Sequence, residues 1–278
     1  GGKDHLSAIN KLKEEGDWPG QAINLSSQFL SKQPMSLIKR QLNLTYADLE
    51  DQYQEIMDYT NPTIKRKLLL DFANSCDSAA VHLKAAALPR QKTQVLLPID
   101  ELKDNEIYAP NYKNGERVVL IRYPHGGTFE IPELVVNNKN PAAKKALGNA
   151  IDAVGINSKV AERLSGADFD GDTATVIPVN DKVKVKTSRP LKELEGFDPK
   201  AVYSTEGKTG VRLMKESQKQ KQMGIVSNLI TDMTLKNAPP EEIAMAVKHS
   251  MVVIDAVKHK LDYKQSEKDN HIEELKQK

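Results

Sequence analysis

The stretch Asp168-Phe169-Asp170-Gly171-Asp172 decides how the rest of this 278-residue sequence is interpreted. Its aspartates stand at alternate positions, and Gly171 frees the backbone, so a tight loop can turn all three carboxylates toward one point. Carboxylates that close repel one another unless a cation lies among them. Because oxygen ligands without sulfur or imidazole favour hard cations, the three aspartates predict a site for Mg²⁺, with Mn²⁺ as an alternative.

A calcium-binding loop and a solvent-exposed turn are the two alternatives to a magnesium site in this acidic stretch. A calcium loop of the EF-hand kind needs Gly at position 6, Glu at position 12 and a helix on each side. Counted from Asp168, these positions hold Thr173 and Val179, and the downstream segment reads as a strand, which argues against calcium. A solvent-exposed turn stays open because Asp-Gly is a common turn pair, although Phe169 and the apolar strand after the loop argue against it.

Short apolar stretches separated by turn residues predict a β-barrel around the acidic loop. Asn114-Gly115 and Gly126-Gly127 are turn signals between strands. The expected strands are 95–97, 106–108, 118–121, 129–131, 134–136 and 173–177. Short helices are expected at 141–151 and 158–164.

The chain divides into three predicted regions. Residues 1–88 form a helical N-terminal region, because Ala, Leu, Lys, Glu and Gln dominate it and apolar residues recur at helical spacing. Residues 89–181 form the barrel with its metal-binding loop. Residues 182–278 form a basic connector, broken by proline and glycine, followed by helices at 211–236, 240–257 and 266–277. The predicted fold class is therefore α+β, with a barrel core flanked by N-terminal and C-terminal helical regions.

Composition excludes several classes of protein. The chain is 39% hydrophobic and 28% charged, as in soluble globular proteins, and no apolar run approaches the ~20 residues that a membrane helix needs. Cys76 is the one cysteine, which excludes an internal disulfide or a zinc cluster and favours a reducing, cytoplasmic setting without membrane contact. The chain begins Gly1-Gly2 with no methionine, which predicts a piece of a longer protein.

A net charge of +2 does not identify a nucleic-acid-binding protein, but the basic residues are grouped. Such groups can follow a phosphate backbone, and they can equally be solvated helix faces. One group is Lys182, Lys184, Lys186, Arg189 and Lys192, and the other is Lys208, Arg212, Lys215, Lys219 and Lys221.

The stretch 166–172, Gly-Ala-Asp-Phe-Asp-Gly-Asp, resembles the signature Asn-Ala-Asp-Phe-Asp-Gly-Asp of the largest subunit of multisubunit RNA polymerases. In that family the aspartates hold the catalytic Mg²⁺ on a double-psi β-barrel. The resemblance therefore implies catalytic and metal-binding roles for Asp168, Asp170 and Asp172. Gly166 departs from the signature at a position that is not a metal ligand in the family.

A second resemblance lies upstream of the acidic loop. Residues 120–124, Leu-Ile-Arg-Tyr-Pro, are similar to the family's Asn-Arg-x-Pro segment, with Arg122 and Pro124 in register and Ile121 in place of Asn. The resemblance implies that Arg122 and Pro124 bind substrate, with the arginine beside the incoming nucleotide and its sugar. A guanidinium suits this place because it combines a fixed charge with several donors. A surface arginine at a strand end is the alternative.

A third resemblance covers helical segments after the barrel. Residues 223–228 and 249–259 are similar to segments of the RNA-silencing RNA-dependent RNA polymerases, which are single chains with the same two-barrel core. Phage-encoded single-chain RNA polymerases give the closest overall picture. Lys258 and His249 are thereby candidates for contacts with phosphate or template, while packed amphipathic helices explain the same segments.

The resemblance implies that the chain carries the metal-binding catalytic barrel of a nucleotidyltransferase. Such an enzyme makes an RNA product on a nucleic-acid template from ribonucleoside triphosphates by two-Mg²⁺ in-line displacement. It also implies a second barrel whose lysines face the nucleotide phosphates. The single β region accounts for one barrel, so the second is expected in a missing N-terminal part or in a partner chain. This chain alone is expected not to polymerise.

Two other functions stay open beside the polymerase. A non-catalytic nucleic-acid-binding or structural module that retains the barrel is the main alternative, although three carboxylates facing phosphate would repel it. A Mg²⁺-dependent nuclease is less well supported, because no general base precedes or follows the acidic loop closely. His125 could serve only if the fold brought it there, and Gly126-Gly127 beside it suggests a turn.

Overall fold

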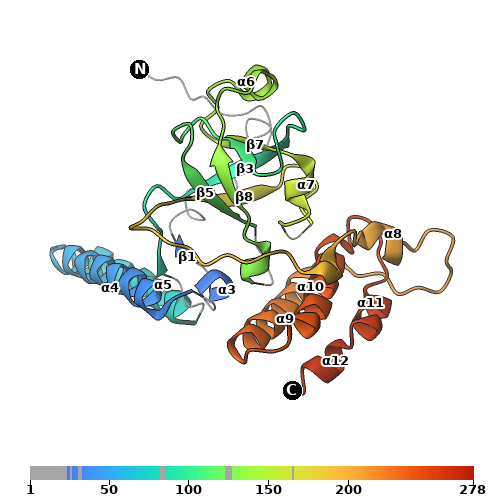
Figure 1. Ribbon diagram of the computed structural model, residues 1–278. Helices are drawn as coiled ribbons and strands as arrows, with labels where there is room; N and C mark the ends of the chain where they lie inside the picture. Colours follow the sequence, from blue (N-terminus) through green and yellow to red (C-terminus); the bar gives the residue numbers. More distant parts are fainter. Residues whose placement is uncertain (1–23, 26, 31–32, 82–84, 123–126, 165) are drawn as a thin grey trace.

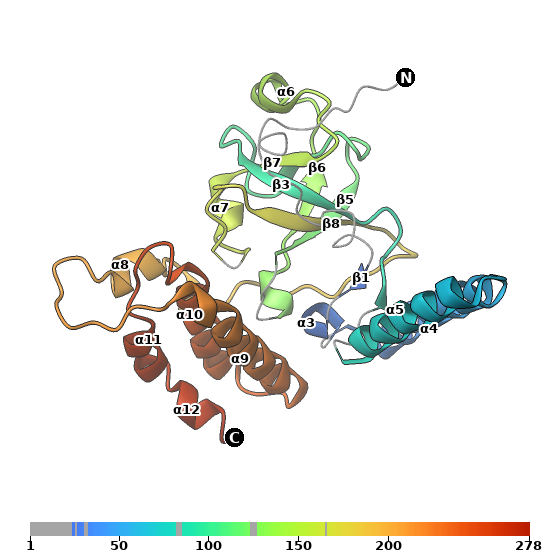
Figure 2. The ribbon, with the colours of Figure 1, turned by 180° about the vertical axis from the view of Figure 1, so that it is seen from behind.

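The computed structural model describes residues 24–25, 27–30, 33–81, 85–122, 127–164 and 166–278. In both Figure 1 and Figure 2 a β-barrel lies above two groups of helices, one from each end of the chain. The predicted arrangement, a barrel flanked by N-terminal and C-terminal helices, is confirmed. The division of the chain at residues 88 and 181 stays a prediction.

Six short strands form the barrel. They are β3 (Lys92–Pro98), β4 (Glu106–Tyr108), β5 (Arg117–Ile121), β6 (Glu133–Val136), β7 (Ala153–Ile156) and β8 (Thr173–Val179). They close in the order β3-β7-β4-β6-β5-β8. Pairs β3–β7 and β4–β6 are parallel, and the remaining pairs are antiparallel. This closed topology fits the predicted double-psi β-barrel.

Strand β5 shows why the barrel has helices against its outer surface. Val118, Val119, Leu120 and Ile121 are all buried, although successive side chains of a strand point to opposite faces. Val118 and Leu120 pack inside the barrel. Val119 and Ile121 belong to a second core, shared with the N-terminal residues Leu25, Phe29, Leu30 and Leu88. A strand that is buried on both faces needs consecutive apolar residues, and residues 118–121 are such a run.

The N-terminal elements carry this second core and a pair of long helices. They are β1 (Asn24–Leu25), α3 (Ser27–Leu30), α4 (Met35–Met57), α5 (Pro62–Val81) and β2 (Ala85–Ala86). Helix α5 begins after Asn61, whose Oδ1 accepts hydrogen bonds from the backbone N–H groups of Thr63 and Ile64 at 3.0 and 3.2 Å. Helix α4 is tied to the chain that enters the barrel, because buried Gln41 donates to the carbonyls of Ala86 and Ala87.

The C-terminal group is a helical unit with its own apolar core. Its helices are α8 (Pro199–Tyr203), α9 (Glu216–Leu235), α10 (Pro240–Asp255), α11 (Tyr263–Asp269) and α12 (Ile272–Leu275). Helices α9 and α10 pack on each other through Val226, Ile230, Val247 and Met251. Pro240 at the first turn and the acidic Glu241 and Glu242 begin α10, as the sequence predicts.

Several segments differ from the sequence prediction. Residues 129–131, expected as a strand, contribute to the 3₁₀ helix η1 (Thr128–Glu130), which the Glu130 N–H closes onto the Gly127 carbonyl. Strand β7 was missed because its small residues, including Gly155, carry a weak strand signal. The helix expected at 266–277 divides into α11 and α12, because His271 has a left-handed backbone with φ 51°.

Shorter elements complete the chain, and helix ends shift from their predicted positions. Helix α9 begins at Glu216 rather than at residue 211. The remaining helices are α6 (Pro141–Leu147), α7 (Ser158–Ala161) and the 3₁₀ turn η2 (Lys192–Leu194). Among the described residues, no helix combines the length and the apolar character needed to cross a membrane. The cytoplasmic setting stays a prediction.

Gly155 leaves no room for a larger side chain in β7. A Cβ atom there would lie 2.7 Å from Ile99 Cγ1 and 3.0 Å from Leu147 Cδ1. We expect Gly155→Ala to lower the free energy of unfolding by about 1–3 kcal/mol through overpacking, as measured by urea denaturation. Ile99→Ala removes the nearest atom, so the alanine should cost less in that background. An equal cost in both backgrounds would contradict overpacking.

His249 makes stability depend on pH. The side chain is buried in α10, with Nδ1 2.9 Å from Ser266 Oγ, and burial lowers the pKa of His249 to about 4. The unfolded state titrates near 6.5 and therefore binds more protons between these values. The contribution of His249 to the free energy of unfolding is therefore fully present above pH 6.5, and it is lost as the pH falls toward 4.

We expect the wild type to lose about 3 kcal/mol of unfolding free energy from this group between neutral pH and pH 4. In His249→Gln this contribution disappears, because glutamine does not titrate. Urea denaturation of both proteins across this range measures the difference. The same pH slope in both would show that His249 is not the responsible group.

Candidate metal centre

The acidic loop connects α7 to β8 and is held to the barrel by Asp172 and Phe169. The backbone N–H of Leu96 in β3 donates to the carbonyl of Asp172 at 2.9 Å, which joins the end of the loop to the barrel. Phe169 packs against the barrel core, although its backbone has φ 59°, a left-handed conformation that is costly for an aromatic residue. Gly171 has φ 105°, which a residue without Cβ adopts readily. Burial of Phe169 offsets the strain that turns the aspartates on either side of it outward.

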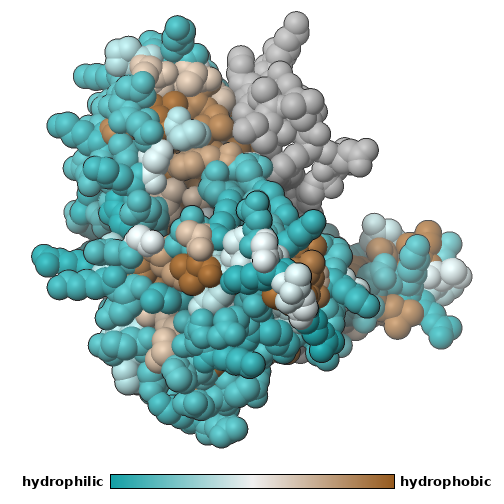
Figure 3. Space-filling view, turned by 90° about the vertical axis from the view of Figure 1, so that its right-hand side faces the viewer, coloured by the Kyte–Doolittle hydropathy of each residue, from teal (hydrophilic) through white to brown (hydrophobic). Residues whose placement is uncertain are grey.

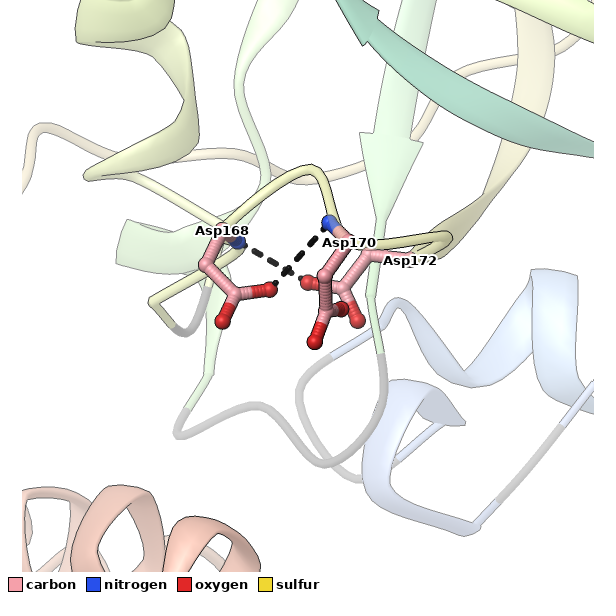
Figure 4. A group of neighbouring side chains, drawn as sticks. All are labelled: Asp168, Asp170 and Asp172. Carbon is pink, nitrogen blue, oxygen red and sulfur yellow. Dashed lines mark hydrogen bonds between the residues drawn. The ribbon is translucent and has the colours of Figure 1, made fainter. Parts of the chain in front are cut away.

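The three carboxylates meet on one side of this loop. Asp168, Asp170 and Asp172 each offer an oxygen, and these oxygens lie within 4.8 Å of one another. Figure 4 shows the carboxylates turned to the same side. The Asp168 N–H donates to Asp172 Oδ2 at 2.9 Å, and the Asp170 N–H donates to Asp168 Oδ1 at 3.4 Å. The loop's own backbone thus helps to hold together groups that repel one another.

Each aspartate also has one basic partner. Arg122, at the end of β5, donates to Asp172 Oδ1 at 2.9 Å. Lys200 of α8 lies 3.3 Å from Asp168 Oδ2, and Lys258, just after α10, forms an ion pair with Asp170 Oδ2. The barrel therefore supplies the partner of one carboxylate, and the C-terminal helical unit supplies the partners of the other two.

The neighbouring positive charges favour the ionised form of Asp168. Partial burial alone would raise the pKa of Asp168, but hydrogen bonds from Lys200 and the loop, with the charges of Lys200 and Lys258, hold this pKa below its ordinary value. Asp255, at the end of α10, responds in the opposite direction. Burial and then the negative charge of Asp168 raise the pKa of Asp255. An ionised Asp168 suits a cation, and this aspartate also affects a further carboxyl group nearby, that of Asp255.

This donor set fits a hard divalent cation. All three ligands are carboxylate oxygens, the donors that Mg²⁺ and Mn²⁺ prefer, and no sulfur or imidazole lies in the group. The aspartates are partly exposed, so an ion can approach from solvent. The identity of the metal stays a prediction.

A cavity of about 390 Å³ opens beside the loop, between the barrel and the C-terminal helices. Asp168 and Phe169 form part of its wall, and Lys200, Met251 and Asp255 face them from the helical unit. The acidic loop therefore lies at the junction of the two units rather than on an isolated turn. This position argues against the solvent-exposed turn that the sequence left open as an alternative.

Gly166 stands where the polymerase signature has asparagine. Its φ is 71°, and a Cβ atom there would lie 2.8 Å from Met251 Cε of α10. Asparagine tolerates left-handed backbone better than most residues, so the backbone alone does not require glycine. Met251 Cε is the far end of a flexible side chain and can move aside, so this contact does not require glycine either.

The structure brings together most of the residues singled out by sequence. The three aspartates, Arg122 and Lys258 lie in one cluster, although no observation tests their roles. Pro124 lies outside the described residues, as does His125. His249 is buried against Ser266, which does not suit contact with a template.

Sequence reasoning missed Lys200 and Asp255. Lys200 lies in the segment that the sequence predicts as a basic connector, and Asp255 lies in the predicted helix 240–257, where nothing in the local pattern marks it. Only the packing of the helical unit against the barrel brings them to the loop.

Neither of the two basic groups predicted from the sequence has a buried member. The C-terminal helices, low in Figure 3, present a mainly hydrophilic surface.

Comparisons with known proteins support the fold. No protein-family model matches the sequence, and no curated protein is significantly similar to it. The structure is similar to the RNA-dependent RNA polymerase QDE-1 from Thielavia terrestris, with a TM-score of 0.52 and 14% sequence identity. The similarity covers 89% of this chain and 37% of that chain, so this chain spans just over a third of its length. The predicted resemblance to the double-psi-barrel RNA polymerases is thereby confirmed at the level of the fold.

Proposed function

We propose that this chain is the metal-binding catalytic barrel of a polymerase that makes RNA on a nucleic-acid template. The observation that carries the proposal is the convergence of Asp168, Asp170 and Asp172 on a strained loop of a closed barrel. The likeness of the whole fold to an RNA-dependent RNA polymerase supports it. A protein that only binds nucleic acid gains nothing from gathering three carboxylates where phosphate must approach.

The aspartates would hold Mg²⁺, or Mn²⁺ in its place. A bound divalent ion supplies a Lewis acid that lowers the pKa of an RNA 3′-hydroxyl and offsets charge on the triphosphate. Arg122 keeps Asp172 in position through their partly buried ion pair, so the oxygens converge before any ligand arrives. Preorganised ligands of this kind avoid rearrangement at the moment of reaction.

Arg122, Pro124 and Lys258 are the proposed substrate-binding residues. Arg122 lies at the edge of the loop, where a nucleotide sugar beside the metal would come within its reach. Lys258 is half exposed on the side of the loop that faces the C-terminal helices, where its ammonium group can meet phosphate. The role of Pro124 rests on the resemblance alone.

The proposed enzyme is larger than this chain. The described residues contain one closed barrel, and the chain spans 37% of the similar polymerase. We therefore infer a second, lysine-bearing barrel in a longer protein or in a partner chain, with ribonucleoside triphosphates bound between the two. This chain alone is then expected to be inactive.

The metal site can be tested on this chain alone. In crystals soaked with Mn²⁺ we expect an anomalous difference peak within coordination distance of Asp168, Asp170 and Asp172. The triple Asp→Asn variant keeps the shape of the loop and should show no peak. Carboxylates that bind no ion and point apart into solvent would favour the non-catalytic module instead.

The catalytic role needs the complete polymerase, with this chain joined to its lysine-bearing barrel. Asp170→Ala should reduce template-dependent incorporation of ribonucleotides by at least about a thousandfold, because the site loses one of three metal ligands. Asp181→Ala is the matched control, since it removes an exposed aspartate after β8, and it should leave activity unchanged. Circular dichroism checks the fold of both variants. Retained synthesis in Asp170→Ala would exclude the proposed mechanism.

A further inference from the structure

Two of the three loop carboxylates are neutralised from outside the barrel. Lys200 reaches Asp168 from α8, and Lys258 reaches Asp170 from the segment after α10. Asp172 differs, because its partner Arg122 belongs to the barrel itself. The loop thus has one internal counterion and two that belong to the C-terminal helical unit.

The three ion pairs also differ in burial, and burial decides which basic side chain another cation can replace. The side chains of Arg122 and Asp172 are 11% and 16% exposed. Those of Lys200 and Asp168 are 41% and 28% exposed, and those of Lys258 and Asp170 are 52% and 42% exposed. Exposed ion pairs contribute little free energy and break readily, whereas breaking a buried pair leaves a charge without compensation. The lysines are therefore the exchangeable partners.

The lysines hold particular oxygens. Asp168 Oδ1 already accepts the Asp170 N–H, and Lys200 lies against Oδ2 of the same carboxylate. Lys258 lies against Oδ2 of Asp170. An ammonium group and a divalent ion compete directly when they need the same carboxylate, because both are cations.

Lys200 can leave Asp168 without unfolding its helix. Asp198 caps α8 by accepting the Lys200 N–H at 2.9 Å, and Tyr203 of the same helix donates to Asp269 at 3.0 Å. These contacts fix the backbone, while the long side chain remains 41% exposed. A lysine so placed can swing between Asp168 and a nearby anion at low cost.

We propose that Lys200 and Lys258 are exchangeable counterions of the metal-binding loop, which a divalent cation displaces from Asp168 and Asp170. This inference rests on the proposed metal centre and adds a positioning role for Lys200. The displaced ammonium groups remain beside the cleft, where they are available to the phosphates of a nucleoside triphosphate. Metal binding in this way converts two carboxylate-bound lysines into phosphate-binding lysines and loosens two links between the barrel and the helical unit.

Metal affinity gives the first test. Electron paramagnetic resonance counts free Mn²⁺ during titration of the 278-residue chain. Lys200→Met removes the competitor at Asp168 and should tighten Mn²⁺ binding about two- to fivefold, the size expected for an exposed ion pair. The double variant with Lys258→Met should bind more tightly still. Lys208→Met, which removes an exposed lysine from the connector, should leave the affinity unchanged. Weaker binding in Lys200→Met would mean that the lysine supports Asp168 rather than competes for it.

Chemical labelling tests displacement directly. Acetylation of lysines by an amine-reactive ester, followed by mass spectrometry, should show that Mn²⁺ increases labelling of Lys200 and Lys258 and leaves Lys208 unchanged. In Asp168→Asn this response of Lys200 should disappear. Labelling that is insensitive to Mn²⁺ in the wild type would overturn the inference.

The two proposals fail in different ways. If neither the wild type nor the lysine variants bind Mn²⁺, both the metal centre and the exchange are wrong. If Mn²⁺ binds but neither affinity nor labelling responds to Lys200, the metal centre stands and the exchange is wrong.

Discussion

Mutual repulsion of three carboxylates is the constraint on which the centre of this protein depends. Oxygens of Asp168, Asp170 and Asp172 lie within 4.8 Å of one another, a separation that is unfavourable unless positive charge or N–H groups offset it. The surrounding structure meets this need with two backbone N–H groups and three basic side chains. A hard divalent ion would satisfy the same oxygens more completely.

The barrel provides the rigidity that this arrangement requires. Strands β3 and β5 both pair with β8, whose first residue follows the loop, and Leu96 binds the carbonyl of Asp172. Phe169 accepts a left-handed backbone because its ring packs on the barrel core. Strain of this kind persists only where the surrounding structure determines the local conformation. The conformation of the loop therefore depends on the closed barrel that holds it.

The C-terminal helices belong to the same centre, although they lie outside the barrel. They contribute Lys200, Lys258 and Asp255, and their Met251 lies close to Gly166 at the start of the loop. Local chemistry at the aspartates and the docking of the helical unit are coupled through these contacts.

The sequence by itself determined the acidic loop with its grouped carboxylates, the mixed fold and most of the strands, because these features depend on residues that are neighbours in the chain. Alternating aspartates around a glycine and continuous apolar runs such as Val118–Ile121 are local patterns. The weak strand β7 was decided by the tertiary structure, since Gly155 gains its place from pairing with β3 and β4 rather than from its own propensity. Tertiary structure alone also assigned Lys200 to Asp168 and buried His249. Contacts between residues far apart in the chain depend on how whole elements pack, and periodicity along one segment carries no information about the segment that will lie against it.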